Sequence, residues 1–366
     1  MRRLTTITLL ALTALLAVAQ PQVTWLERQH DFGVFLEENG KVRCDLRLVN
    51  TGDEPLLIVK AQVGCGCTAT NYPETPIQPG DTAAIEISYN PAGRPGQFTK
   101  EVLVFTNTEP KRTLLEITGN VIPSAATLDK QYPVQAGALR ISQRNIPFGE
   151  LTRGKNRTQY LSAYNASTDT ILVAVASDKT HMRPAVVPDT VPPGRVTALT
   201  VHYLSKLAPQ WGFNIDSLTL TCKPLRQPSQ ATAGSAVINV MAQVMEDFEG
   251  LTEQERRDAP VVRVDCDDHL DFGTITPGQP LTRTFTVTNK GKNNLIIRRL
   301  WVPADEFIQV SANRTEVKRG KTATVTVTID PTLTDEKMLN VPLTLLCNDP
   351  DSPRLTIKLV GIIDKK

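Results

Sequence analysis

Three motifs organise this 366-residue chain: Asp31-Phe32-Gly33, Asn50-Thr51-Gly52 and Val63-Gly64-Cys65-Gly66-Cys67-Thr68. Between the first two motifs, residues 41–50 alternate apolar and polar side chains, which is typical of a half-buried β-strand. The glycines and the asparagine favour turns, because they tolerate a positive φ. The phenylalanine is expected to bury its ring between two sheets. The pattern predicts short strands joined by tight turns.

The opening motif returns twice farther along the chain, as Pro147-Phe148-Gly149 and as Asp271-Phe272-Gly273. Asn165 and Asn289 each follow the glycine of their own copy by 16 residues, against 17 residues in the first copy. A spacing that recurs this closely indicates one structural module used three times. The paired cysteines occur in the first copy alone.

The composition favours an all-β fold. Pro (26) and Gly (21) punctuate short segments rich in Thr and Val, as expected for a β-sandwich. We predict three tandem immunoglobulin-like (Ig-like) sandwiches after a signal peptide. The predicted boundaries are 1–19 for the signal peptide, 20–122, 123–245 and 261–366 for the three domains, and 246–260 for a charged linker that is the expected hinge.

The first residues have the pattern of an export signal. Met1-Arg2-Arg3 is positively charged, an apolar run follows, and Ala17-Val18-Ala19 matches a signal-peptidase site. We therefore expect an exported bacterial protein, periplasmic or associated with the cell envelope, whose mature chain has no transmembrane span. The net charge of +2 without a long basic run gives no indication of a nucleic-acid partner.

The first copy resembles the bacterial DUF1573 family over about residues 25–122. The matching positions are Asp31, Phe32, Gly33, Asn50, Gly52, Cys65, Gly66, Cys67, Thr68, Pro79 and Gly80. The resemblance implies an Ig-like sandwich related to the major sperm protein, PapD-like and ASPM–SPD-2–Hydin domains, in a cell-envelope setting. It implies no activity.

The chain contains six cysteines, and in an exported protein they can be oxidised. Three interpretations of Cys65-Gly66-Cys67 remain open: a packed structural turn with Cys44 as a disulfide partner, a soft-metal site, or a redox pair. The motif lacks the Cys-x-x-Cys spacing of redox enzymes. A separate disulfide, Cys266–Cys347, is predicted, because the first strand and a late strand of an Ig-like sandwich meet at one end of the domain.

Four Asp-Thr/Ser-aliphatic triplets resemble the O-glycosylation sequon of some bacterial envelopes. The candidate acceptors are Thr82, Thr170, Thr190 and Ser217.

The sequence contains no catalytic triad, phosphate-binding loop or nucleotide fingerprint, so we expect no enzymatic activity and no cofactor. The first hypothesis is a cell-envelope scaffold or adaptor that binds protein partners through its Ig-like modules. The alternatives are a periplasmic chaperone that binds clients by strand addition, and a metal or redox protein that uses Cys65 and Cys67.

Overall fold

The computed structural model describes residues 20–225, 233–276 and 278–364. The predicted signal peptide, residues 1–19, lies outside the described residues. The described chain is almost entirely β-structure and forms six sheets around three hydrophobic cores. Each core lies between two sheets, and we call these units the first, middle and last sandwich. The all-β, Ig-like class that the sequence predicts is confirmed, whereas the domain boundaries remain predictions.

The first sandwich consists of two four-stranded sheets, with the orders β1-β3-β6-β5 and β2-β8-β7-β4. Alternate residues of each strand face the core, as the period-two pattern of residues 41–50 predicts. The strands are β1 (Val23–Trp25), β2 (Gln29–Leu36), β3 (Val42–Asn50), β4 (Ile58–Val63), β5 (Thr68–Asn71), β6 (Thr82–Tyr89), β7 (Gly96–Thr106) and β8 (Arg112–Ile122), with a 3₁₀ turn η1 (Glu37–Asn39).

The middle sandwich has two five-stranded sheets, β14-β16-β12-β10-β9 and β11-β18-β17-β13-β15. Helix α1 (Ala125–Gln131) precedes it. Its strands are β9 (Val134–Ala136), β10 (Leu139–Ile141), β11 (Asn145–Thr152), β12 (Arg157–Asn165), β13 (Ile171–Ala176), β14 (Met182–Val187), β15 (Thr190–Val191), β16 (Val196–Tyr203), β17 (Gly212–Pro224) and β18 (Gly234–Met245), with η2 (Ser205–Leu207).

The last sandwich combines a four-stranded sheet, β19-β21-β25-β23, with a five-stranded one, β20-β27-β26-β22-β24. Helix α2 (Glu253–Asp258) precedes it. Its strands are β19 (Val262–Val264), β20 (His269–Ile275), β21 (Leu281–Asn289), β22 (Leu295–Trp301), β23 (Ile308–Ala312), β24 (Glu316–Val317), β25 (Thr322–Ile329), β26 (Met338–Cys347) and β27 (Arg354–Ile363), with η3 (Pro331–Leu333).

The Phe-Gly motif is a β-bulge in an edge strand. Strand β2 runs parallel to β8, and the register shifts between Asp31 and Val34. Strands β11 and β20 shift at the equivalent place against β18 and β27. Gly33, Gly149 and Gly273 have φ of 67°, 64° and 64°, which a residue with a Cβ rarely adopts.

The phenylalanine rings of the motif pack into the cores to different degrees. Phe148 and Phe272 are each 1% exposed, as the sequence predicts, whereas Phe32 is only half-buried against its core. The motif therefore interrupts the regular pairing of the edge strand, which resumes after the bulge, and anchors that strand to the core.

The asparagine of each copy fixes the turn that follows β3, β12 or β21. Asn50 is fully buried, and its Nδ2 donates to the carbonyl oxygens of Glu54 and Ile77 at 2.8 and 2.9 Å. Asn165 and Asn289 make the same pair of bonds in their own copies. These bonds satisfy backbone acceptors that the turn would otherwise leave buried and unpaired.

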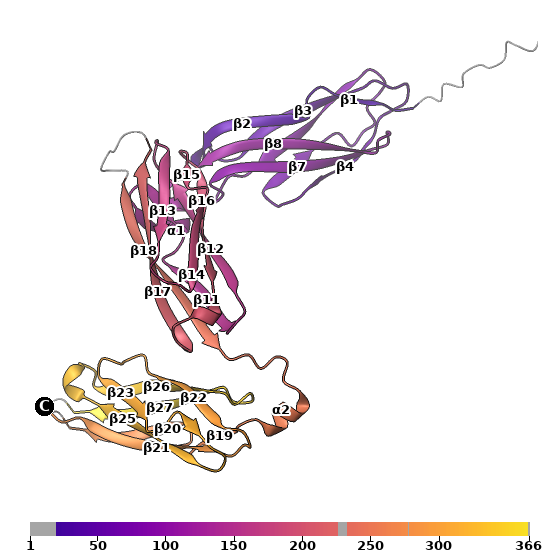
Figure 1. Ribbon diagram of the computed structural model, residues 1–366. Coiled ribbons are helices and arrows are strands. Elements are labelled where there is room, and N and C mark those ends of the chain that lie inside the picture. The colour runs from indigo at the N-terminus through magenta and orange to yellow at the C-terminus, as the bar shows by residue number, and fades with distance from the viewer. Residues whose placement is uncertain (1–19, 226–232, 277, 365–366) are drawn as a thin grey trace, which may run out of the picture.

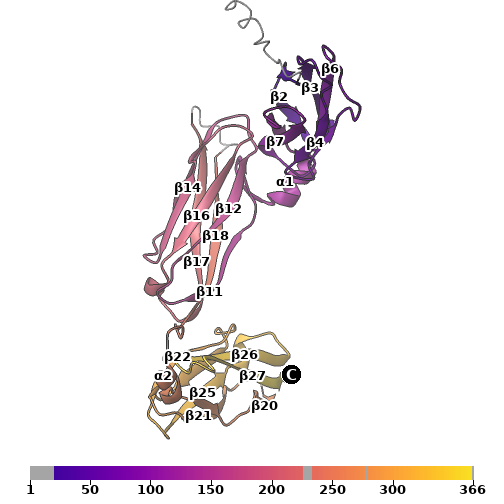
Figure 2. The ribbon, with the colours of Figure 1, turned by 90° about the vertical axis from the view of Figure 1, so that its right-hand side faces the viewer.

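The three sandwiches follow one another along the chain, and a long connection that carries α2 joins β18 to the last sandwich (Figures 1 and 2). One end of the first sandwich meets the middle one beside α1, and the opposite end of the middle sandwich meets the last. Two ion pairs tie the charged linker to the last sandwich, Glu246 with Arg298 and Asp258 with Lys292. Its role as a hinge remains a prediction. Among the described residues, no helix is long and apolar enough to cross a membrane.

Candidate functional site

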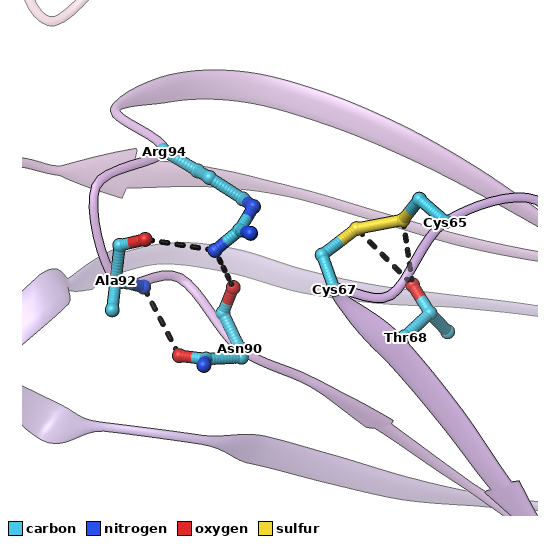
Figure 3. The surroundings of a disulfide bond; sticks show 6 residues. All are labelled: Cys65, Cys67, Thr68, Asn90, Ala92 and Arg94. Atoms are coloured by element: carbon cyan, nitrogen blue, oxygen red, sulfur yellow. Dashed lines mark hydrogen bonds between the residues drawn. A yellow bond between two sulfur atoms is a disulfide. The ribbon is translucent and has the colours of Figure 1, made fainter.

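The Cys-Gly-Cys motif contains a disulfide between Cys65 and Cys67 (Figure 3). The pairing with Cys44 that one interpretation of the sequence included is therefore wrong, and Cys44 is a reduced thiol. The bonded cysteines lie between β4 and β5, which are outer strands of the two opposite sheets of the first sandwich. The disulfide thus stiffens the crossing from one sheet to the other.

Hydrogen bonds hold this disulfide loop onto the sandwich. The backbone N–H of Thr68 donates to the carbonyl of Cys65 at 3.3 Å, and that of Asn90 donates to the carbonyl of Cys67 at 2.9 Å. The Thr68 hydroxyl lies 3.8 and 3.7 Å from the two sulfurs, which have no proton of their own to donate. The loop is therefore fixed at both cysteines.

The neighbouring turn is braced by an arginine, as Figure 3 shows. Arg94 Nη1 donates to the carbonyl oxygens of Asn90 and Ala92 at 3.3 and 2.8 Å. The Asn90 side chain accepts in turn from the Ala92 N–H at 3.1 Å. The disulfide loop consequently rests on a second ordered turn.

The surface beside the disulfide has a shallow hollow of about 290 Å³. Cys67 is buried at 7% exposure, whereas Cys65 is half-buried and borders the hollow with Lys100 and Glu101. Sites for small molecules are usually larger than this and mostly apolar. The arrangement fits contact with a protein surface better than enclosure of a small ligand.

The metal interpretation needs thiolates, and in this oxidised form both sulfurs of Cys65 and Cys67 are bonded to each other. The part of the chain that the structure describes holds no group of three side chains of the kinds that ligate metals. Burial, with the neighbouring Asp45 and Glu27 carboxylates, raises the pKa of the Cys44 thiol to about 11. This thiol is therefore protonated at neutral pH and is a poor nucleophile.

The predicted Cys266–Cys347 disulfide is absent, and both residues are reduced thiols. The first strand and the end of β26 do meet, but the contact is made by Val262, whose N–H donates to Asp349 Oδ2 at 2.9 Å. Cys266 lies four residues farther along, roughly 13 Å at the rise of an extended chain. Burial raises the pKa of Cys266 to about 11 and that of Cys347 to about 12.

The four candidate glycosylation acceptors differ in accessibility. Thr82, Thr190 and Ser217 are exposed, whereas Thr170 is half-buried. Thr82, Thr190 and Ser217 lie on β6, β15 and β17, and Thr170 directly precedes β13. Their modification remains a prediction.

A second site, which the sequence analysis missed, joins the middle and last sandwiches. Arg299 of β22 donates from Nη1 to the carbonyl oxygens of Trp211 and Phe213, at 2.9 and 2.6 Å. Burial lowers the pKa of the Arg299 guanidinium, with Asp305 opposing that shift, but an arginine stays charged at any physiological pH. The bonds to the two carbonyls are therefore charge-assisted.

Aromatic and ionic contacts reinforce this junction. The guanidinium carbons of Arg153 and Arg298 lie 4.4 and 5.0 Å from the ring centre of Trp211, so cations from both sandwiches contact one indole. Arg298 also pairs with Glu246 through two bonds of 2.9 and 2.7 Å, and both side chains are mostly buried. A cleft of about 400 Å³, bordered by Trp301, lies beside these contacts.

We call this set of contacts the junction clamp. Its donor and acceptor residues are separated by as many as 88 positions in the chain, and no local motif marks them. The sequence holds one indication of this site, because two of the three tryptophans in the chain, Trp211 and Trp301, lie at the junction clamp.

Comparisons with known proteins agree with this architecture. Residues 23–121 match the family described as protein of unknown function (DUF1573), and residues 260–361 match the HYDIN/CFA65/VesB-like, Ig-like domain. A search of curated proteins found no match. Both matched families are Ig-like or related modules of a class that generally binds proteins and lacks catalytic activity.

Three solved structures are similar to parts of this chain, at low sequence identity. A protein of unknown function from Porphyromonas gingivalis W83 is 17% identical, with 62% of this chain and 100% of that chain covered and a TM-score of 0.48. The PapD-like domain 7 of human CEP192 is 12% identical, with 31% and 92% covered and a TM-score of 0.26. The YadV chaperone is 9% identical, with 61% and 99% covered and a TM-score of 0.25.

The resemblance predicted from the sequence is thus confirmed: the chain carries a DUF1573 segment at residues 23–121 and a HYDIN/CFA65/VesB-like, Ig-like segment at residues 260–361.

Proposed function

We propose that this protein is a non-enzymatic scaffold of the bacterial cell envelope, which holds protein partners at fixed positions along its three sandwiches. The observation that carries the proposal is the junction clamp. Arg299 and the Arg298–Glu246 pair fix the angle between two sandwiches. A protein that only tethers its partners has no use for such a fixed angle, whereas a scaffold that spaces them does.

The junction between the first and middle sandwiches supports the same role. Glu37 accepts hydrogen bonds from the N–H groups of Gly93 and Ser124 and from the Thr127 hydroxyl, at 2.7, 2.8 and 2.7 Å. One carboxylate therefore ties the first sandwich to the start of α1. Gln131, in the last turn of α1, donates to the carbonyl of Gly93 at 2.6 Å.

The disulfide loop is the surface that we assign to partner binding in the first sandwich. Its glycines, Gly64 and Gly66, are exposed on a backbone that the disulfide holds rigid, so little conformational entropy is lost when a partner binds. Export, which the N-terminal sequence predicts, provides the oxidising compartment in which the Cys65–Cys67 bond persists.

The chaperone alternative requires a long free edge for strand addition. In the first sandwich, the outer strands β4 and β5 have six and four residues, and the longer edge strand β2 is interrupted by its bulge. Short and bulged edges are the means by which sheets avoid pairing with other chains. The described edges therefore favour the scaffold.

Cross-linking in cells that make the protein, followed by purification and mass spectrometry, tests the proposal. A scaffold gives one or a few partners in constant stoichiometry, all in the envelope fraction. Many unrelated, unfolded clients would instead support a chaperone, and a cytoplasmic location would contradict the proposed setting. The Cys65→Ser/Cys67→Ser variant should weaken partner binding, with Cys44→Ser as the matched control.

A further inference from the structure

The cleft beside the junction clamp has two walls, one from each sandwich. The first wall is the start of β17, from Phe213 to Asp216. The second is the end of β22 and the loop after it, with Trp301 and Asp305. Its volume of about 400 Å³ lies within the range of ligand sites in proteins. We call it the junction cleft.

The walls of the junction cleft are held in place before any ligand binds. Arg299, which borders the cleft, donates to the carbonyl oxygen of Phe213 in the opposite wall at 2.6 Å. Val302 is only 4% exposed and anchors the second wall in the core of the last sandwich. A site whose walls are already ordered loses little conformational entropy when a ligand binds.

Two aromatic rings supply most of the apolar lining. Phe213 and Trp301 are both half-buried, and their ring centres lie 5.7 Å apart at an interplanar angle of 48°. The face of an aromatic ring carries partial negative charge, so it attracts C–H groups, whose hydrogens are slightly positive. The rings therefore favour a ligand that presents a surface of C–H groups.

Ordered polar side chains lie beside the rings. Asn214 donates from Nδ2 to the carbonyl oxygens of Gln210 and Gly212, at 3.1 and 2.8 Å. One carboxylate oxygen of Asp216, Oδ2, lies 2.9 Å from Nε2 of His181, which is 4% exposed. These contacts fix the orientation of the Asn214 and Asp216 side chains, and both residues border the cleft.

The lining disfavours three classes of ligand. An anion would face two carboxylates, Asp216 and Asp305, against the single guanidinium of Arg299. A wholly apolar ligand would cover these charged groups without giving them hydrogen bonds. A metal ion needs a third protein ligand, and within the described ranges no three such side chains gather.

A sugar ring has the combination of groups that the cleft favours. Its faces carry C–H groups that stack on Trp301, and each of its hydroxyls both donates and accepts hydrogen bonds. The hydroxyls can donate to the carboxylate of Asp305 and accept from the guanidinium of Arg299. We propose that the junction cleft binds a neutral saccharide. This site is separate from the disulfide loop, which we assign to protein partners in the first sandwich.

Saturation-transfer NMR on the full mature chain tests the proposal. The neutral probes are cellobiose, lactose and di-N-acetylchitobiose, and digalacturonic acid is the acidic probe. At least one neutral probe should receive saturation through its ring C–H groups, and it should shift the tryptophan fluorescence of a Trp25→Phe chain, because Trp301 borders the cleft. Digalacturonic acid should bind more weakly, since its carboxylates face Asp216 and Asp305.

A matched pair of variants assigns the binding to the cleft. Asp305→Asn should weaken the binding of the neutral probe by about 10- to 100-fold, because a charged acceptor is lost. Glu306→Gln is the control: Glu306 is the next residue and is also exposed, but it lies outside the lining of the cleft. This variant should bind the probe as the wild type does. Both changes are at exposed positions, so both chains should fold.

A chain that binds none of the three neutral probes overturns the inference. A preference for digalacturonic acid overturns it as well, and so does binding that Asp305→Asn and Glu306→Gln weaken equally. Cys65→Ser/Cys67→Ser should leave saccharide binding unchanged, so the two proposals can fail separately. A chain that binds no saccharide but keeps an envelope protein in constant stoichiometry remains a scaffold, and only the saccharide site is wrong.

Discussion

Replacing Arg299 by alanine should open the junction between the middle and last sandwiches. The change removes two charge-assisted hydrogen bonds, to the carbonyl oxygens of Trp211 and Phe213. Bonds to a charged group contribute about 1.5–3 kcal/mol each when they are buried. Because Arg299 is partly exposed, water replaces part of this interaction. We expect the closed junction to lose about 2–3 kcal/mol of stability relative to the open one, which lowers the equilibrium constant for closing by about 30- to 150-fold.

Tryptophan fluorescence measures this change directly, because Trp211 and Trp301 both lie at the junction. A Trp25→Phe background leaves these two as the tryptophans of the chain, which are excited selectively over its tyrosines at the long-wavelength edge of absorption. In Arg299→Ala, acrylamide should quench them more strongly, and their signal should change at a lower urea concentration. The experiment is performed on dilute protein, so that contacts between chains do not contribute.

Lys60→Ala is the matched control, since Lys60 occupies the position in the first sandwich that Arg299 occupies in the last. Lys60 contacts the Phe105 ring at 4.4 Å, an exposed cation–π contact of about 0.5–1 kcal/mol. Its removal should leave the fluorescence of the junction unchanged. Equal quenching in the Arg299→Ala and Lys60→Ala variants would refute the assignment of the clamp to Arg299.

Three further predictions concern the other contacts of the chain. Gly212→Ala and Gly96→Ala share the cost of a Cβ at positive φ, about 1–2 kcal/mol, but the first also clashes with the last sandwich and should release the junction, as detected by the same fluorescence assay. Cys65→Ser/Cys67→Ser should lower the free energy of unfolding by about 1–2 kcal/mol, because the loop that the disulfide closes is short; a reductant that destabilised the double variant as much as the wild type would contradict this. Partial burial raises the pKa of Glu37, but its hydrogen-bond donors outweigh burial and hold the pKa below its usual 4.5. Its stabilising contribution is thus complete above pH 4.5 and is lost as the pH falls through the lowered pKa; Glu37→Gln should remove that part of the acid sensitivity in a melting-temperature profile.

Local patterns predicted the sandwiches well because their causes are local. A glycine at positive φ beside a buried phenylalanine is a requirement of the bulge itself, so Gly149 and Phe148 could be identified without knowing what they pack against. Asn50 could likewise be identified as a turn residue, but only one of its two side-chain bonds, to Glu54, is local, whereas the other reaches Ile77, 27 positions away.

Pairings between distant residues could not be predicted in this way. The Cys266–Cys347 prediction placed the correct segments of the last sandwich near each other. It did not identify which residue of the first strand lies there. That residue is Val262, whose N–H donates to Asp349, just after β26. The Cys65–Cys67 bond was not predicted, because the structural interpretation paired the motif with Cys44 and the redox interpretation was disfavoured by the spacing, which is not Cys-x-x-Cys.

The junction clamp depends on the relative placement of two sandwiches. An arginine such as Arg299 in an amphipathic strand looks like an ordinary solvent-facing residue. Only the folded chain brings the carbonyl oxygens of Trp211 and Phe213 to it.

Small-angle X-ray scattering of the dilute, monomeric mature chain tests most directly the claim that the sandwiches have a fixed arrangement. The account predicts a distance distribution that matches the single arrangement in Figure 1 for the wild type and broadens in Arg299→Ala. A wild-type distribution that fits only a broad mixture of angles between the sandwiches would contradict it.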